Sequence, residues 1–537
     1  MLNWGTMGVF LAVFVVVAIV GLRAASWRSG DLSRLVEWGL AGKQVGFVAG
    51  WFLLAGTIYS ANAFIAIPGL VYAQGAQGFY PVIYTTLDYI LLFVVLTRFW
   101  IIARHRGYVT TADFVRERFG RGMAVLVALT GILATMPYLA VQLYGIEVVI
   151  AQMGIPVEAA LLVAFFFLSI STYLSGLRAP AAIAFLKQSM LILVVLVGWI
   201  AILPQIGGLS QLFAAVHQKT LQQPATFSDI LLPSQYLAFS TQILGAALAL
   251  FLYPHTITVF LSVKSHKVLK RNAVALIFYS FLLFLVVSFG YLAIAARIQP
   301  SATYKTNAIL PALFMHFFPA WFTGFAFAAL VLGALVPAAI MSIGVANLFT
   351  RNIYREYLRP ACSEREETRV ARAVSLLSKC GALVIILFIP ITFANNLQLM
   401  GSVWILQTLP AVFLGLYTRW FQRGALMLGW IGGMIAGTWM LVQQNFASFS
   451  AFQFGAQPFR VYTGIVALGV NLALAVALTP MLRRWGKPDG PDLPSEIDFQ
   501  VEPLLHSASS SGAKLPEGGQ DGSDMGSILP GEVARKR

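Results

Sequence analysis

Two interrupted apolar segments decide the fold that this sequence predicts. The first reads GTIYSANAFIAIPG at residues 56–69, and the second reads LFLYPHTIT at residues 250–258. Each places proline, small residues and hydroxyl residues in the middle of a longer apolar stretch. Proline removes a backbone donor and clashes with the preceding turn, so a helix breaks there. In a helix that spans a membrane, unpaired backbone groups are tolerated only where they line a cavity. We therefore expect two broken helices that face a common cavity.

The composition around these segments places the chain in a membrane. The hydrophobic share of the 537 residues is 58% and the charged share is 11%, whereas a soluble domain has about 45–50% and about 25%. A disordered protein and a soluble enzyme are therefore poor fits, and two cysteines support no disulfide framework. A helix needs roughly 20 apolar residues to cross the hydrocarbon core. This window predicts about thirteen spans, at residues 5–22, 47–73, 80–103, 122–152, 157–175, 181–203, 235–262, 273–296, 319–350, 370–392, 395–417, 424–443 and 459–482.

The net charge of +15 is distributed unevenly between the loops that join these spans. Loops rich in arginine and lysine alternate with loops that hold only Lys219, Arg297, Lys305 and Arg460. Positive loops stay on the cytoplasmic side. We therefore expect a protein of the plasma (inner) membrane with its N-terminus outside and its C-terminus in the cytoplasm. The charge needs no nucleic acid to explain it, and the lipid bilayer is the expected partner.

Several further motifs carry a resemblance to a known family. They are WGLAGK at 38–43, IPG at 67–69, TADF at 111–114 with RFG at 118–120, SGLRA at 175–179, and NIYR at 352–355 with Pro360. In this order and spacing they resemble the sodium:solute symporter family. Within that family, GALVPAAIMS at 333–342 and WILQTLP at 404–410 resemble the monocarboxylate permease subgroup.

The resemblance implies an all-α integral membrane protein built from two inverted repeats of five helices, with one broken helix at the centre of each. It divides the chain into a first transmembrane helix with a cytoplasmic loop, the first repeat with an external loop, the second repeat, two peripheral helices and a tail. These units are residues 1–46, 47–234, 235–417, 418–486 and 487–537. The tail is rich in Ser, Gly, Pro and acids, and we expect it to be disordered.

The same resemblance implies a secondary active transporter rather than an enzyme. We expect it to import small organic monocarboxylates such as lactate, pyruvate or acetate by alternating access, together with a coupling ion (H⁺ or Na⁺) and with no other cofactor. The alternative is a sodium-coupled symporter of another small solute, such as an amino acid, a vitamin or another carboxylate. A membrane-embedded acyltransferase that uses His255 is less favoured, because the sequence has no HExxH, Walker or GxSxG motif. The sequence makes no prediction for the oligomeric state.

The resemblance also implies a sodium site where the broken second helix meets the ninth helix. Its oxygen donors match the backbone carbonyls of Gly56, Tyr59 and Ala339, and the side chains of Ser342 and Ile343. An isoleucine offers no oxygen to a hard cation, and Ala184 stands where the family often has an aspartate. The sequence therefore favours proton coupling or a much weakened sodium site.

Three ionisable residues within the spans are candidates for the coupling. The ammonium of Lys187 could fill the space of the missing sodium ion, and its protonation could drive transport. Alternatively, Lys187 extends to the inner surface, as we expect of Lys379. The acids Asp88 and Glu147 either relay protons or are solvated in an outer vestibule. We take Lys187 and Asp88 as the candidate coupling residues.

The predicted substrate site lies between the two breaks. Free N–H groups at the start of a half-helix, with the positive end of its dipole, suit a carboxylate. His255 either binds the substrate or remains a neutral imidazole that caps groups freed by Pro254. The expected lining residues are Ser60, Asn62, Ala63, Tyr138, Gln142, Tyr253, His255, Thr256, Trp404 and Gln407.

Overall fold

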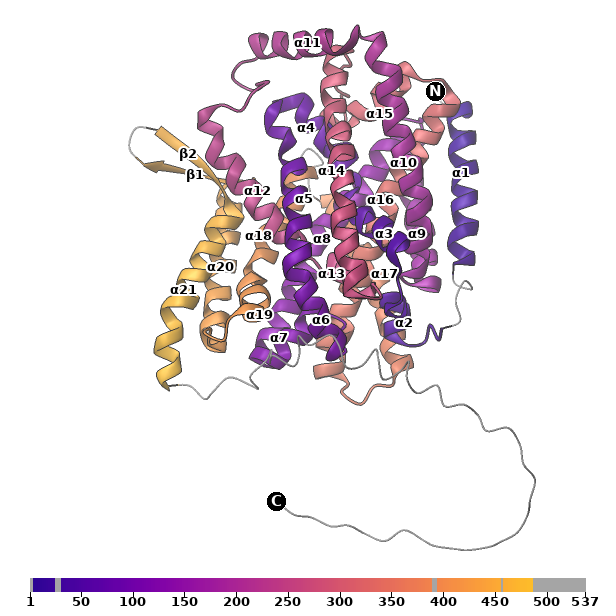
Figure 1. Ribbon diagram of the computed structural model, residues 1–537. Helices are drawn as coiled ribbons and strands as arrows, with labels where there is room; N and C mark the ends of the chain where they lie inside the picture. The colour runs from indigo at the N-terminus through magenta and orange to yellow at the C-terminus, as the bar shows by residue number, and fades with distance from the viewer. Residues whose placement is uncertain (1–2, 25–29, 389–393, 455–456, 486–537) are drawn as a thin grey trace, which may run out of the picture.

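The structure is a computed structural model, and it describes residues 3–24, 30–388, 394–454 and 457–485. Long helices run side by side through the molecule (Figure 1). Helix α11 (Gly208–Gln222) lies across one end of this bundle, whereas α2 (Leu35–Leu40) and α7 (Thr111–Phe119) lie at the opposite end. The expected tail, residues 487–537, lies outside the described residues.

Within the described residues, nine helices are long and apolar enough to cross a membrane, or up to eleven if each of two bent pairs is one span. The bent pairs are Phe47–Ile58 with Asn62–Gln74, at 52°, and Pro233–Leu250 with Pro254–Ser262, at 49°. Both breaks therefore lie in the segments that the sequence singles out. The helical multi-pass fold agrees with the sequence, whereas the count of thirteen crossings and the inverted repeat stay predictions.

The first part of the chain forms helices and short helical turns up to α11. In chain order these are α1 (Trp4–Arg23), α2, η1 (Ala41–Lys43), α3 (Phe47–Ile58), η2 (Asn62–Ala66), α4 (Ile67–Gln74), η3 (Ala76–Phe79), α5 (Tyr80–Leu91), η4 (Leu92–Leu96), α6 (Thr97–His105), α7, α8 (Arg121–Ala151), α9 (Val157–Ser175), α10 (Arg178–Gln205) and α11.

The second part continues in the same manner and adds one hairpin. Its elements are η5 (Pro233–Gln235), α12 (Tyr236–Leu250), α13 (Pro254–Ser262), α14 (His266–Ala295), η6 (Thr306–Ala308), α15 (Ile309–Phe317), α16 (Ala320–Phe349), η7 (Thr350–Leu358), α17 (Glu364–Phe388), α18 (Ala394–Ile405), η9 (Leu406–Thr408), η10 (Pro410–Leu414), α19 (Gly415–Tyr417), α20 (Arg423–Gln443), β1 (Phe449–Phe454), β2 (Gln457–Tyr462) and α21 (Thr463–Trp485).

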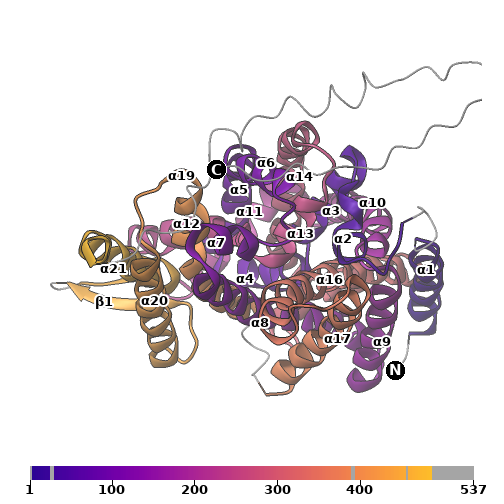
Figure 2. The ribbon, with the colours of Figure 1, turned by 90° about the horizontal axis from the view of Figure 1, so that it is seen from below.

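Helix α16 forms the centre of the bundle. It contacts α8, α10, α13 and α17, and nearly all of its side chains are buried. Figure 2 shows α20, α21 and β1 at one edge of the molecule and α1 at the opposite edge. Outward-facing apolar side chains on the long helices, such as Ile90, Ile200, Ile277 and Ile435, are exposed, as a lipid-facing surface requires. The broken helices are thereby held inside a shell of complete helices.

The hairpin of β1 and β2 departs from the expectation of an all-α chain. Its strands pair antiparallel with Phe449 opposite Tyr462, and the rings of Phe452 and Phe459 stack at 5.9 Å. Phenylalanine makes up half of FSAFQF (449–454), and aromatic residues are enriched in strands. The last helix therefore begins at Thr463, later than the predicted start at 459.

Candidate substrate and coupling site

The first break lies between α3 and α4. Tyr59 leaves the helical conformation, with φ −78° and ψ 77°, and the wide turn η2 follows before the chain becomes regular again. The Oε1 atom of Gln142, on α8, accepts a hydrogen bond of 3.0 Å from the N–H of Ala61. Gln142 thus satisfies a backbone donor that the break leaves free, and ties the break to α8.

Lys187 satisfies the carbonyl groups of the same break. Its Nζ atom donates to the carbonyl oxygens of Gly56, at 2.9 Å, and Tyr59, at 2.6 Å. These carbonyls are the two that match the family's sodium ligands on the broken helix. The side chain is fully buried and points into the break, so it does not extend to the inner surface. The Lys187 amine therefore lies against both carbonyls that match the family's sodium ligands on this helix.

Gly56 lies close to α10 and α16. A Cβ atom at Gly56 would lie 3.8 Å from both Ala184 on α10 and Val336 on α16. Almost two turns further along α16, Ser342 donates to the carbonyl of Ala339 at 2.8 Å, and Ile343 is fully buried. The two α16 residues that match sodium ligands, Ala339 and Ser342, are therefore hydrogen-bonded to each other.

A second lysine lies beside that half of the site. Lys379 is almost fully buried, so the expectation that it extends to the inner surface is wrong. Its Nζ atom donates to Ser375 Oγ at 3.4 Å, and Ser375 donates to Ser342 Oγ at 3.0 Å. Sequence reasoning missed Ser375, because a serine in an apolar helix gives no signal of its partner.

Lys43 offers a comparison outside the membrane spans. Its Nζ atom donates to the carbonyl of Tyr108 at 2.8 Å, and it joins the segment before α3 to the segment before α7. Burial lowers the pKa of Lys43 to about 8. This lysine therefore shows the same type of contact as Lys187 in a position remote from the breaks.

The second break lies between α12 and α13, and its polar groups are mostly unsatisfied. His255 is fully buried, and neither of its ring nitrogens has a hydrogen-bond partner among the described residues. The Thr256 hydroxyl and the Asn62 side-chain oxygen of the first broken helix likewise lack partners in the described part of the chain. The interpretation of His255 as a cap for groups freed by Pro254 therefore has no hydrogen bond to support it.

Aromatic rings surround His255. The rings of Tyr138, on α8, and Tyr253 lie 5.4 Å and 5.3 Å from the imidazole. The Tyr253 hydroxyl lies 3.3 Å from the Gln398 carbonyl and 3.3 Å from Ser402 Oγ, both on α18. These α18 residues were missed from the sequence, although each is a polar residue in an apolar span. His255 is therefore flanked by two tyrosine rings, and its ring nitrogens make no hydrogen bond within the described residues.

Two of the expected lining residues face elsewhere. Trp404 donates from Nε1 to Thr438 on α20 at 3.1 Å. Gln407 accepts from Asn471 on α21 at 3.1 Å and donates to the Val403 carbonyl at 2.9 Å. Both side chains join α18 and η9 to the peripheral helices, so we leave them out of the proposed lining. Ser60 and Ala63 are buried at the first break.

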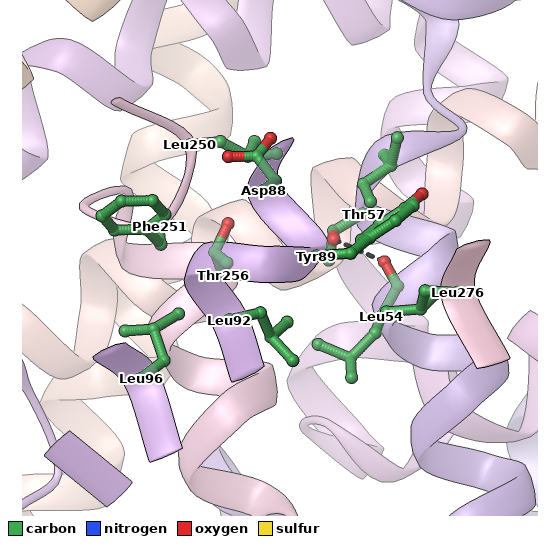
Figure 3. A pocket seen from close by; sticks show the side chains of 11 residues that line it. Leu54, Thr57, Asp88, Tyr89, Leu92, Leu96, Leu250, Phe251, Thr256 and Leu276 are labelled. Atoms are coloured by element: carbon green, nitrogen blue, oxygen red, sulfur yellow. Dashed lines mark hydrogen bonds between the residues drawn. The ribbon is translucent and has the colours of Figure 1, made fainter. Parts of the chain in front are cut away.

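The two acids of the outer half are both buried, so solvation in an outer vestibule does not describe them. Glu147 accepts a hydrogen bond of 3.1 Å from the hydroxyl of Tyr304. In contrast, neither carboxylate oxygen of Asp88 has a hydrogen-bond partner within the described ranges. Asp88 lines a small cavity together with Thr57 of α3 and Thr256 of α13 (Figure 3). Asp88 therefore lies between the two breaks.

Comparisons with known proteins agree with this architecture. The model of the sodium:solute symporter family matches residues 38–432. The chain belongs to this family. The symporter is similar to the monocarboxylate transport permease protein of Rhizobium johnstonii, with 42% identity over 483 residues that cover 90% of this chain and 98% of the relative. It is also similar to the uncharacterized symporter YodF of Bacillus subtilis, with 28% identity and coverage of 87% and 92%.

A solved structure shares the fold of this symporter. It is the substrate-bound, outward-open state of a Na⁺-coupled sialic acid symporter, with a TM-score of 0.72 and 16% identity. The alignment covers 91% of this chain and 99% of the solved chain. As a member of the sodium:solute symporter family with several apolar helices long enough to span a membrane, the chain is a multi-pass membrane transporter and not an enzyme.

Proposed function

We propose that this symporter imports small organic monocarboxylates, such as lactate, pyruvate or acetate, and couples their uptake to protons. The observation that carries the coupling is the Lys187 ammonium, which donates to the carbonyls of both Gly56 and Tyr59. A similar relative is named a monocarboxylate transport permease, which supports the substrate class.

The second break offers a site for a carboxylate. Helix α13 begins at Pro254, and its first N–H groups and positive dipole end favour an anion. His255, Thr256 and Asn62 bring buried polar groups that find no partner among the described residues. A buried polar group without a partner costs about 1–3 kcal/mol, so a ligand that supplies hydrogen bonds would gain from each of them. Tyr138 and Tyr253 would close the aromatic side of this site.

The first break offers the coupling switch. A protonated Lys187 holds the Gly56 and Tyr59 carbonyls together by charge-assisted hydrogen bonds. A neutral amine binds them more weakly, so loss of the proton to the cytoplasm frees the broken helix to change its angle. Uptake of a proton from outside restores the bonds. The proton gradient thereby biases the two conformations that alternating access needs.

We also propose the topology implied by the loop charges. The chain crosses the membrane thirteen times, with the N-terminus outside and the C-terminus in the cytoplasm of the plasma (inner) membrane. Residues 47–234 and 235–417 form the two inverted repeats, and residues 418–486 form the peripheral helices. The clustering of ion pairs at the α2 and α7 end supports this orientation, since Arg116 and Arg121 both pair with Glu356 there.

The test is uptake of labelled lactate or pyruvate into proteoliposomes with imposed gradients. An inward proton gradient should drive accumulation when sodium is replaced by choline, and a sodium gradient at equal pH should not. Strict sodium dependence without a pH effect would contradict proton coupling and favour the alternative, a sodium symporter. A panel of dicarboxylates, amino acids and sugars tests the substrate class independently of the coupling ion.

A further inference from the structure

A small cavity lies between the two broken helices. Its volume is about 20 Å³, room for one water-sized particle. It is lined by residues of α3, of α5 and η4, of the α12–α13 break and of α14 (Figure 3). Most of its lining is leucine, isoleucine and phenylalanine, and the exceptions are Thr57, Asp88, Tyr89 and Thr256.

Asp88 is the charged side chain in this lining. Its exposed fraction is 5%, and that of Thr256 is 7%; neither carboxylate oxygen nor the Thr256 hydroxyl has a hydrogen-bond partner in the described chain. The other titratable groups close enough to affect Asp88 are Tyr84 and Tyr89 on its own helix and Tyr138 on α8. The helices opposite Asp88 line the cavity with the non-titrating residues Thr57, Thr256 and Leu276. The neighbouring His255 does not line the cavity and packs against the ring of Tyr138. No cation of the described residues lines the cavity.

The position of Thr256 connects Asp88 to the proposed anion site. Thr256 is in the first turn of α13, a helix of nine residues, so Asp88 shares its cavity with the positive end of that helix. An ionised Asp88 gains from this end, whereas an unpaired carboxylate elsewhere in an apolar cavity is strongly disfavoured. A substrate carboxylate needs the same N–H groups and the same dipole end.

We infer that Asp88 is a proton-operated competitor of the substrate for the N-terminus of α13. An ionised Asp88 repels a second carboxylate from the N-terminus of α13. A protonated Asp88 carries no charge, so the substrate carboxylate can bind there. This inference rests on the proposed function, and it adds a second titrating group to Lys187. In this scheme the protonation of Asp88 controls how tightly the substrate anion binds, and the protonation of Lys187 controls the equilibrium between the two conformations.

The charge balance of this step is complete. The empty site holds one negative charge, on Asp88. The loaded site also holds one negative charge, on the substrate, because one proton from the outer solution has bound to Asp88. Linkage then requires that substrate binding takes up a proton and that acid raises substrate affinity by the same free energy.

The experiment measures equilibrium binding of labelled lactate to the purified full-length symporter between about pH 6 and about pH 8.5, where lactate stays ionised. The dissociation constant of the wild type should rise about tenfold over this range. Asp88→Asn, a mimic of the protonated acid, should bind tightly with a change below about twofold. Asp88→Glu should retain the pH dependence, and so should Glu147→Gln, the matched control at a buried acid that is hydrogen-bonded to Tyr304.

A second readout needs no variant. Lactate added to weakly buffered wild-type protein at about pH 8 should remove about one proton from solution for each molecule bound. A pH-independent dissociation constant in the wild type, or an unchanged pH dependence in Asp88→Asn, would overturn the inference. If lactate and pyruvate do not bind at any pH, the proposed substrate class fails instead. Lys187→Gln should keep the pH-dependent binding and lose only gradient-driven accumulation.

Discussion

The two helix breaks of this symporter differ in the side chains that bind their backbone groups. At the first break, Lys187 and Gln142 occupy the carbonyls and an N–H group with short hydrogen bonds. At the second break, His255 and Thr256 are buried without hydrogen-bond partners among the described residues. A side-chain amine thus binds the backbone of the first break, whereas polar side chains of the second break have no partner in the described chain. This difference is the basis for proposing cation coupling at one broken helix and anion binding at the other.

The largest effect on transport is expected when Lys187 is replaced at the first break. Lys187→Gln loses the ammonium that, in the proposed cycle, holds the carbonyls of Gly56 and Tyr59, so gradient-driven accumulation in proteoliposomes should fall at least about tenfold. Lys43→Gln is the matched control, because it also loses a lysine-to-carbonyl bond but lies outside the breaks. Normal accumulation by Lys187→Gln would show that the first break has no coupling role that sets it apart from the second.

The next effect tests the break that awaits a ligand. His255→Gln should raise the KM for lactate uptake about tenfold, because a charged hydrogen bond contributes about 1.5–3 kcal/mol. Its melting temperature should stay unchanged, since the imidazole makes no hydrogen bond within the described chain. Tyr253→Phe should instead lower the melting temperature and leave the KM unchanged, because the Tyr253 hydroxyl contacts Gln398 and Ser402. A lower melting temperature with an unchanged KM would make His255 a structural residue.

A stability measurement compares the breaks directly. Gln142→Ala leaves the Ala61 N–H buried without its acceptor, so the free energy of unfolding should fall by about 1–3 kcal/mol. Thr256→Val at the second break removes a hydroxyl that has no partner in the described residues, and stability should not fall. Thermal unfolding in detergent measures both. Equal losses in the two variants would show that the second break is satisfied too.

Lys43 gives a pH-dependent effect of smaller size. Its pKa is about 8 in the folded chain against an ordinary value of 10.5. Between these values the unfolded chain binds more protons, so stability should rise with pH from about 8 to about 10, by about 1–2 kcal/mol. Lys43→Met should flatten this part of the curve. An unchanged slope in the variant would assign the effect to other groups.

The smallest effect is expected at Ser342. Ser342→Ala removes bonds to Ala339 and Ser375 and should cost about 1 kcal/mol or less. Uptake should remain insensitive to sodium in both forms, because Lys187 supplies the cation. If sodium stimulates uptake in the wild type and this stimulation disappears in Ser342→Ala, then Ser342 is a sodium ligand and the proposal of proton coupling is wrong.

The sequence predicts the breaks, and the position of Lys187 beside one of them, for clear physical reasons. Proline and small residues within an apolar span interrupt a helix, and a charge in a span must find a partner. The position of a side chain around its helix is harder to predict. Helix α16, for example, is apolar on nearly every side. On α18 and η9, the side chains of Trp404 and Gln407 face α20 and α21 and not the predicted substrate site. Where no polar face exists, hydrophobic periodicity gives no orientation.

Lys379 and the hairpin illustrate the same limit. A lysine about three turns into a span can extend to the surface or remain inside. Lys379 remains inside, where it donates to Ser375 one turn earlier on α17, and Ser375 in turn donates to Ser342 of α16. The hairpin depends on pairing between segments of six residues each, which local composition predicts weakly. Both outcomes are set by contacts between elements.

The covalent attachment of Lys187 to α10 has a consequence for the transport cycle. A sodium ion leaves with its cargo, and the empty carrier returns without it. Lys187 stays with the protein in both directions, so in the proposed cycle the forward and return steps differ in the protons that Lys187 and Asp88 carry. The driving force of such a cycle is the proton gradient and not a sodium gradient.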